Sequence, residues 1–379
     1  MRFLYCPAGI GRFGVIAALW AVFSTAGISQ VPTPTTRVVE EAGVITVDTE
    51  LIDVPVVVTD KAGKPILDLK RSNFTIFEDN KLQEIADFST TTTPFEVALL
   101  LDTSGSTRSD IDLIKRSAQV FIDSLRPGDK VALISFGSTD DGSGQSVPRI
   151  ISQMTGDRSE LRAALQRVTS SNGTPYYDGL VETVEKIFAG LSSDKTVNRR
   201  AIVALTDGVD STSSADFGEA RELLDREGIV SYFIRVDTRE FFESDLLGDC
   251  QSAIRFSQAQ IRRYYRLVGS RNIERAANFC QLGDFERLAV SKALYELADA
   301  QMYELAKVSG GKVFPVGDLS DARNAFRNVA AEIGTNYSLG YYSSNEKQYG
   351  TYRKIRVQLK NLPPGASVRA REGYTATKK

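Results

Sequence analysis

The chain has 379 residues, which is enough for two domains, and an ordinary globular composition with 42% hydrophobic and 25% charged residues. Its formal net charge of -2 creates no overall field that would recruit nucleic acid or a membrane surface. The sequence has no histidine, which excludes Ser-His-Asp and Cys-His catalysis and any imidazole zinc site.

Residues 1–27 have the features of a secretory signal peptide. Arg2 and Arg12 precede the apolar stretch 13–23, and small residues at 24–26 follow it as a cleavage site. This stretch is shorter than the ~20 residues that a membrane-spanning helix needs, although an uncleaved N-terminal anchor is the alternative. The sequence therefore predicts a secreted, periplasmic or cell-envelope protein, with residues 28–43 as an extended linker.

Residues 44–93 show short apolar segments separated by polar turns, a pattern typical of a β-sandwich. The predicted strands cover residues 44–47, 51–60, 74–77 and 82–88. Such strands have one apolar face that needs a second sheet to cover it. Three strand-like segments near the C-terminus can supply that sheet, at residues 337–342, 352–359 and 367–374. We therefore expect residues 44–93 and 336–379 to form one β domain, the alternative being two separate β appendages.

Residues 94–335, between these two halves, alternate between apolar strands and amphipathic helices. The predicted strands cover residues 97–101, 130–136, 149–154, 201–206, 229–236 and 312–314. The predicted helices cover residues 109–125, 161–165, 177–191, 215–227, 294–308 and 319–333. Six strands fit an α/β fold with a doubly wound, mostly parallel sheet of order 3-2-1-4-5-6, in which the first and fourth strands are neighbours.

Oxygen-bearing side chains follow the first and fourth of these strands at the point where each ends. The strand FEVALLL leads into Asp102, Ser104 and Ser106. An Asp-x-Ser-x-Ser turn suits Mg2+, which prefers oxygen ligands, although such a turn can also simply cap the next helix. Asp207 ends the strand AIVALT, and Thr174 lies in the loop before the helix at 177–191. In the proposed order the crevice at the carboxyl ends of these strands holds both acids, with Thr174 nearby.

The segments DTSGS, GT and TDG, in this order, resemble the metal-ion-dependent adhesion site of von Willebrand factor type A domains, over residues 94–334. The resemblance implies that the hydroxyls of Ser104 and Ser106 bind a metal directly, and that Thr174 does so in a ligand-bound state. It also implies that Asp102 and Asp207 act directly or through water. The remaining coordination position would accept an Asp or Glu of a partner protein, and residues 137–146 and 209–214 should rim the site.

The flanking β segments resemble, less specifically, those of a bacterial family of secreted proteins with such a domain. The motifs that carry this similarity are VTDKAGKPI near the start of the chain and RAREGY at its end.

Residues 238–293 form an insertion that the fold does not require. Because Cys6 would be removed with the signal peptide, Cys250 and Cys280 remain as an even pair, which in an exported chain indicates a disulfide; two buried thiols are the alternative. The insertion also carries a basic run, which indicates either a surface for an acidic partner or a solvated helix face. Its members are Arg255, Arg262, Arg263, Arg266, Arg271 and Arg275.

These features predict a secreted or envelope-associated protein-binding module that is not an enzyme. It would use Mg2+, with Mn2+ or Ca2+ as alternatives, to bind an acidic side chain of a partner protein. We expect no nucleic-acid partner and no membrane span beyond an uncleaved signal anchor. Two alternatives are a structural envelope protein with a stabilising metal and a Mg2+-dependent phosphoryl-transfer hydrolase. The hydrolase usually needs a second carboxylate or a lysine beside the first, where this chain has Ser104.

Overall fold

A computed structural model describes residues 51–90, 93–104, 110–138, 145–189, 199–251, 253, 255–269, 278–345, 349–362 and 364–376. The predicted signal peptide, the linker and the first predicted strand at 44–47 lie outside the described residues, and so does Ser106. Among the helices of the described part, none combines the length and the apolar composition that crossing a bilayer requires.

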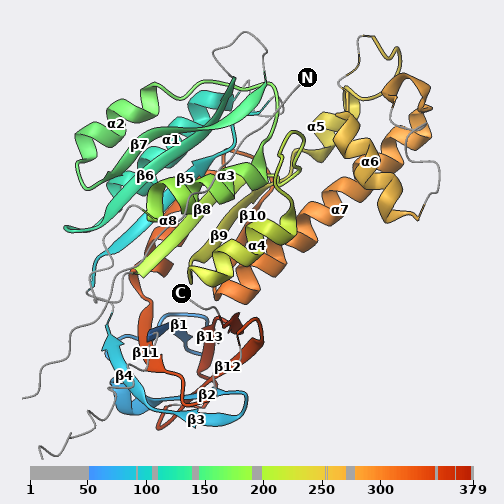
Figure 1. Ribbon diagram of the computed structural model, residues 1–379. Helices are drawn as coiled ribbons and strands as arrows, with labels where there is room; N and C mark the ends of the chain where they lie inside the picture. The colour runs from blue at the N-terminus through green and yellow to red at the C-terminus, as the bar shows by residue number, and fades with distance from the viewer. Residues whose placement is uncertain are drawn as a thin grey trace, which may run out of the picture. The chain divides into compact units, whose positions relative to one another are not determined.

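A six-stranded sheet forms the centre of the α/β domain (Figure 1). Its strands are β5 (Phe95–Leu101), β6 (Lys130–Ser138), β7 (Ser146–Thr155), β8 (Arg199–Thr206), β9 (Val230–Val236) and β10 (Lys312–Val316). Their spatial order is β10-β9-β8-β5-β6-β7, which is the predicted 3-2-1-4-5-6 order counted from the other edge. The edge strand β7 is antiparallel to β6, and the other neighbours are parallel. The predicted doubly wound, mostly parallel sheet is therefore confirmed.

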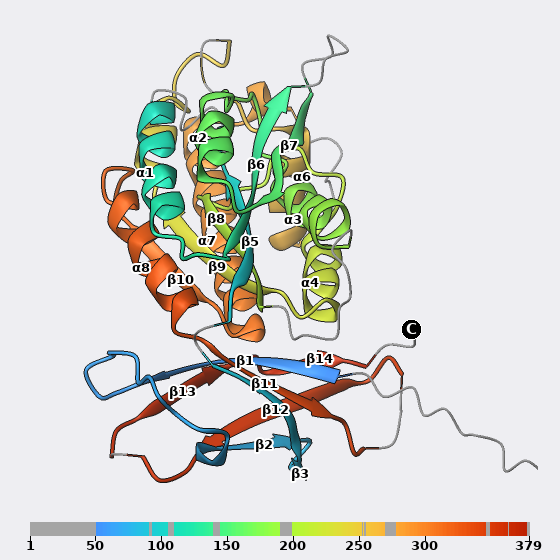
Figure 2. The same ribbon diagram turned by 90° about the vertical axis from the view of Figure 1, so that its left-hand side faces the viewer.

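Helices cover both faces of this sheet, as Figure 2 shows. One face carries α1 (Ile111–Asp123), α2 (Arg158–Gln166) and α8 (Ala322–Gly334). The other carries α3 (Tyr176–Thr183) with the π-helical turn Val184–Phe188, α4 (Phe217–Arg226) and α7 (Asp284–Ser309). Side chains of β5 alternate between these layers, with Leu99 packing on the first and Leu100 on the second. Because both faces are covered, the strand is apolar without interruption from Val97 to Leu101.

Strands from both ends of the described chain pair with one another in two further sheets. The N-terminal strands are β1 (Leu51–Thr59), β2 (Phe74–Glu78), β3 (Lys81–Gln83) and β4 (Ile85–Ser89). The C-terminal strands are β11 (Tyr337–Tyr342), β12 (Tyr352–Leu359), β13 (Ser367–Ala370) and β14 (Gly373–Thr375). The sheet orders are β13-β1-β11-β4 and β14-β12-β2-β3, and both sheets contribute to one apolar cluster. Each end of the chain therefore supplies strands to both sheets, while the domain boundaries drawn from the sequence stay a prediction.

Three elements differ in extent from their predictions, which are wrong on this point. The predicted strand 82–88 is divided at Glu84 into β3 and β4, which lie in different sheets. The predicted strand 367–374 is likewise divided at residues 371–372 into β13 and β14. An apolar pattern does not show where a bend passes the chain from one sheet to the facing one. In addition, α7 begins at Asp284 rather than at 294, so it runs through the last part of the predicted insertion.

A buried carboxylate connects the two ends of the chain in these sheets. Glu78, at the end of β2, accepts hydrogen bonds from four side chains: Tyr341 (2.8 Å), Tyr374 (2.9 Å), Ser343 (2.6 Å) and Asn345 (2.7 Å). Arg353 Nη1 also lies 3.4 Å from its Oε1 atom. Burial alone would raise the pKa of Glu78, but these hydrogen bonds lower it below the ordinary value. Tyr374 belongs to the RAREGY motif, so this motif has a structural role here.

Replacing Glu78 with Ala is expected to lower the free energy of unfolding by about 3–5 kcal/mol, because buried hydroxyls lose their acceptor and the buried Arg353 loses one of its carboxylate partners. Urea denaturation followed by circular dichroism measures this loss. Glu84→Ala is the matched control, since the Glu84 side chain is 94% exposed and lies 3.9 Å from Arg71. Its expected cost is below about 1 kcal/mol. Equal losses in the two variants would contradict the structural role of Glu78.

The partly buried Asp53 in β1 is expected to make the free energy of unfolding depend on pH. Its carboxylate accepts a hydrogen bond from the Ser338 hydroxyl of β11. Burial raises the pKa of Asp53 from 3.8 to about 6, although this hydrogen bond and the charge of Arg371 oppose the rise. The folded protein therefore holds this proton more tightly than the unfolded chain does. The resulting stability is fully present below pH 4 and is lost as the pH rises through 6.

The variant Asp53→Asn is accordingly expected to be more stable than the wild type at pH 7, by about 1–2 kcal/mol because the residue is only partly buried. It should also lose less stability than the wild type between pH 4 and pH 7. Denaturation curves recorded across this pH range provide the measurement. Parallel pH profiles for the two proteins would show that Asp53 does not cause the effect.

Candidate functional site

The carboxyl ends of β5 and β8 place Asp102 and Asp207 beside one another. Leu101 lies opposite Leu205 in the parallel pairing, and the Asp102 N–H donates to the Leu205 carbonyl at 2.9 Å. Thr206 Oγ1 donates to Asp102 Oδ2 at 2.7 Å. The two acids are 2% and 8% exposed, respectively. The strand order therefore brings two buried carboxylates next to one another, as the sequence predicted.

The turn after β5 is held by backbone and hydroxyl hydrogen bonds. Asp102 Oδ1 accepts the Ser104 N–H at 3.0 Å, which forms an Asx turn. Thr103 Oγ1 donates to the carbonyl of Phe136 in β6 at 3.1 Å. The Thr103 carbonyl in turn accepts the Ser171 N–H at 2.8 Å. These bonds connect the Asp102 turn to the loop that carries Thr174.

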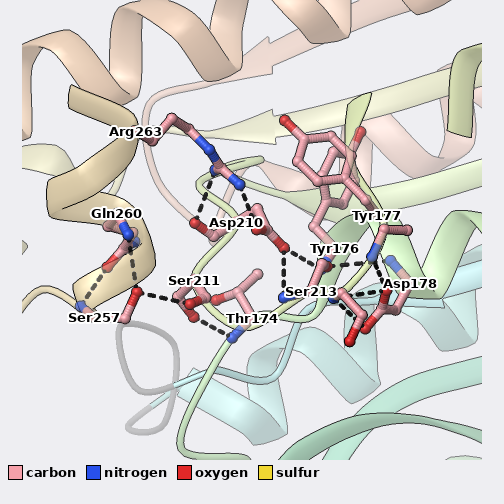
Figure 3. Close-up of polar contacts among 12 residues, drawn as sticks. Thr174, Tyr176, Tyr177, Asp178, Asp210, Ser211, Ser213, Ser257, Gln260 and Arg263 are labelled. Carbon is pink, nitrogen blue, oxygen red and sulfur yellow. Dashed lines mark hydrogen bonds and ion pairs between the residues drawn. The ribbon is translucent and has the colours of Figure 1, made fainter. Parts of the chain in front are cut away.

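The loop 209–214 is bonded directly to the loop of Thr174 (Figure 3). The Thr174 N–H donates to Ser211 Oγ at 2.8 Å, and the Thr174 carbonyl accepts the Ser211 N–H at 3.0 Å. Asp210 Oδ1 accepts the N–H groups of Tyr176 at 3.1 Å and Ser213 at 3.3 Å. Two loops that are distant in sequence are thus joined at the site by hydrogen bonds of their backbones and of the Asp210 and Ser211 side chains.

Two glycines of the polar motifs have geometric reasons to be glycine. Gly208 has a φ of 73°, in the left-handed region that other residues rarely adopt, and a Cβ there would lie 2.9 Å from Met302 Cε. A Cβ on Gly173 would lie 2.8 Å from Thr212 Cγ2. Gly173 therefore allows its loop to approach the loop 209–214, and Gly208 allows the chain after Asp207 to approach α7.

Asp207 is held by residues that the sequence analysis missed. Its Oδ1 accepts the Val209 N–H at 2.9 Å, and its Oδ2 accepts the Thr238 hydroxyl at 2.5 Å. The Thr238 hydroxyl also lies 2.8 Å from the hydroxyl of Tyr295 in α7. A threonine after β9 and a tyrosine inside a long helix carry no sequence signal for this role, since only the fold brings them together.

The electrostatics of the site favour a bound cation. Burial raises the pKa of Asp102, against hydrogen bonds from Thr206 and Ser104 that lower it. Burial, and next the negative charge of Asp102, raise the pKa of Asp207, while the Thr238 hydrogen bond lowers it. Two adjacent buried carboxylates are costly when both are ionised, and a divalent cation would offset that cost.

The possible metal ligands at this site are carboxylate and hydroxyl oxygens, and only two of the residues are acids. Among the described residues, no group of three or more His, Cys, Asp or Glu side chains is arranged to hold a metal ion. A metal here would depend on two carboxylates supplemented by hydroxyl oxygens. Oxygen donors of this kind suit Mg2+, Mn2+ or Ca2+, so the residues present fit such an ion.

Four of the five predicted site residues are described. Asp102, Ser104 and Asp207 lie at the ends of the neighbouring strands β5 and β8, and Thr174 is bonded to the loop after Asp207. Ser106 lies outside the described residues, as do residues 139–144 of the predicted rim at 137–146.

The insertion adds two short helices, α5 (Arg239–Ser244) and α6 (Gln258–Leu267), beside the N-terminal part of α7 (Figure 1). Cys250 and Cys280 form a disulfide with their Cα atoms 5.3 Å apart, which settles the two alternatives for this pair. The insertion has its own apolar cluster, formed by Leu246, Phe256, Ile261, Phe279, Leu282, Val290 and Leu294. In the predicted basic run, Arg255, Arg262 and Arg266 are exposed and Arg263 is partly buried, while Arg271 and Arg275 lie outside the described residues.

Comparison with known proteins identifies the α/β domain. Residues 97–209 match the model of the von Willebrand factor type A domain family. No curated protein sequence matches the chain. One similar solved structure is the conserved hypothetical protein BatB from Bacteroides thetaiotaomicron. It is 18% identical with a TM-score of 0.38, over 63% of this chain and 98% of that protein.

Two further structures with similar TM-scores come from other organisms. A von Willebrand factor type A protein from Catenulispora acidiphila is 12% identical with a TM-score of 0.39, over 88% of this chain and 76% of that one. Proximal thread matrix protein 1 from the mussel byssus, with a zinc-occupied MIDAS motif, is 13% identical with a TM-score of 0.38. That alignment covers 69% of this chain and 50% of the mussel protein. Similarities of this size carry no argument about function.

The match to the family model begins inside β5 and ends at Val209, just after the second buried acid. It therefore spans the strands β5, β6, β7 and β8 and the loops that carry the predicted site residues. The strand order of the sheet agrees with the order that the alternation of strands and helices predicted. The chain contains a von Willebrand factor type A domain.

Proposed function

We propose that this protein is a binding module that holds a divalent cation and uses it to bind an acidic side chain of a partner protein. The residues assigned to the metal are Asp102, Ser104, Ser106, Thr174 and Asp207. The observation that carries the proposal is the burial of two adjacent carboxylates at the ends of β5 and β8, with hydroxyl groups around them. Von Willebrand factor type A domains typically mediate protein interactions, which supports this role.

The hydrogen bonds of the two acids orient their oxygens. Thr206 Oγ1 accepts the Gly208 N–H at 2.8 Å, so its own proton points to Asp102 Oδ2. The Thr238 hydroxyl has a single proton, and because it donates that proton to Asp207, the Tyr295 hydroxyl donates to Thr238. These donors hold the carboxylates in place. When bound, the ion would supply the affinity for a partner's carboxylate.

We assign Mg2+ as the ion, with Mn2+ or Ca2+ as alternatives, because carboxylate and hydroxyl oxygens are hard ligands. We place the protein outside the cytosol, in a secreted or envelope location. The disulfide supports this placement, because such bonds persist in oxidising compartments. We assign no catalytic residue, since Ser104 stands where phosphoryl transfer usually needs a second carboxylate.

The variant Asp102→Ala is expected to weaken metal binding at least about tenfold, because it removes one of the two buried carboxylates. Calorimetric titration with Mg2+ and Mn2+ measures the affinity. Asp112→Ala, an exposed acid in α1, is the matched control and should leave the affinity unchanged. A wild-type protein that binds neither ion would refute the proposed function.

Partner capture from the host's own extract is expected to require both the metal and Asp102. The experiment compares wild type and Asp102→Ala, each with Mg2+ and with a chelator. Capture only by the wild type with Mg2+ supports the binding role. A chelator that lowers the melting temperature but leaves capture intact favours a structural metal, and Mg2+-dependent turnover of a phosphate ester favours a hydrolase.

A further inference from the structure

The helix α6 of the insertion is bonded to the loop 209–214 beside the proposed metal site (Figure 3). Arg263 Nη2 lies 2.9 Å from Asp210 Oδ2, and Arg263 Nη1 donates to the Asp210 carbonyl at 3.2 Å. Ser257 Oγ donates to the Ser211 carbonyl at 2.7 Å. α6 therefore holds the loop at Asp210 and Ser211, the two residues that are also bonded to Tyr176 and Thr174.

The buried carboxylate of Asp210 depends on the positive charge of Arg263. Its side chain is 1% exposed, and its other carboxylate oxygen is already occupied by the two N–H groups described above. The Arg263 guanidinium also lies 5.6 Å from the centre of the Tyr177 ring, which helps to hold it over the loop. Because a buried carboxylate without its cation is strongly unfavourable, loss of Arg263 would drive Asp210 towards water. Any such movement displaces Ser211, the hydrogen-bond partner of Thr174.

α6 is itself fixed by a capping box, by apolar packing and by a disulfide. Ser257 caps the helix: its Oγ accepts the Gln260 N–H at 3.1 Å, and Gln260 Oε1 accepts the Ser257 N–H at 2.9 Å. Ile261 is buried in the apolar cluster of the insertion. The Cys250–Cys280 disulfide closes the segment that contains α6. The described part of the insertion is thus a small, packed unit.

We propose that Arg263 is a positioning residue of the metal site: it holds the loop 209–214 against Thr174, so that the loops around the ion are preformed. This inference rests on the proposed function, because it concerns how the same site is kept ready for its ion. Thr238, the first residue of the insertion, also holds Asp207 and is itself bonded to Tyr295 of α7. Residues from outside the sequence motifs would therefore set the metal affinity.

The test measures Mn2+ affinity in wild type, Arg263→Met, Arg263→Lys and Arg262→Met by electron paramagnetic resonance titration of free Mn2+. Arg263→Met removes the charge and keeps the approximate length of the side chain. It should weaken Mn2+ binding about tenfold, which is the lower limit for residues that orient metal ligands without touching the ion. Arg263→Lys should restore most of the affinity. Arg262→Met is the matched control, because Arg262 is exposed in the same helix and contacts Gln258. Its affinity should match the wild type.

Melting temperatures recorded with a chelator separate positioning from folding. If Arg263→Met does not fold, Asp210→Asn combined with Arg263→Met leaves no unpaired charge and should fold while still binding Mn2+ more weakly than the wild type. Wild-type affinity in either folded variant would overturn the positioning role. Absence of Mn2+ binding by the wild-type protein would instead refute the proposed function, and this inference with it.

Discussion

Asp102 and Asp207 are buried next to each other because two parallel strands that are neighbours in the sheet both end in an acid. Burial raises the pKa values of both acids, and the negative charge of Asp102 raises that of Asp207 further. Most of the surrounding structure can be understood as support for this arrangement. Thr206 and Thr238 each donate a hydroxyl proton to one of the acids, and the covered sheet excludes water from the region beneath them.

The loops around this pair are connected to parts of the protein far from it in sequence. Arg263 reaches the loop after Asp207 from the insertion, and Tyr295 reaches Thr238 from α7. At the other end of the α/β domain, Arg371 donates to Asp225 of α4 at 3.1 Å and so bonds the C-terminal strands to this domain. The same carboxylate accepts the Thr375 N–H at 3.0 Å. The β sheets and the insertion are therefore integrated with the α/β fold by buried, charge-assisted hydrogen bonds.

Sequence patterns were sufficient to predict a helix or strand where apolar residues repeat with the period of that element. The run Val97–Leu101 indicated a strand covered on both faces, and the alternation of strands and helices indicated the order of the sheet. They failed where the chain bends between sheets, at Glu84 and at residues 371–372, because a bend leaves the apolar period unchanged. They also placed the start of α7 too late, because its first turns pack against the insertion and not against the sheet.

The sequence by itself determined the sheet order and the acids and hydroxyls that follow its strands, since local periodicity and short motifs are properties of neighbouring residues. It did not reveal that Thr238 and Tyr295 hold Asp207, that Arg263 pairs with Asp210, or that Glu78 gathers donors from the other end of the chain. Those partners were decided by tertiary structure alone. A buried carboxylate must find hydrogen-bond donors or a cation, and which ones it finds depends on what the fold brings within about 3 Å of it.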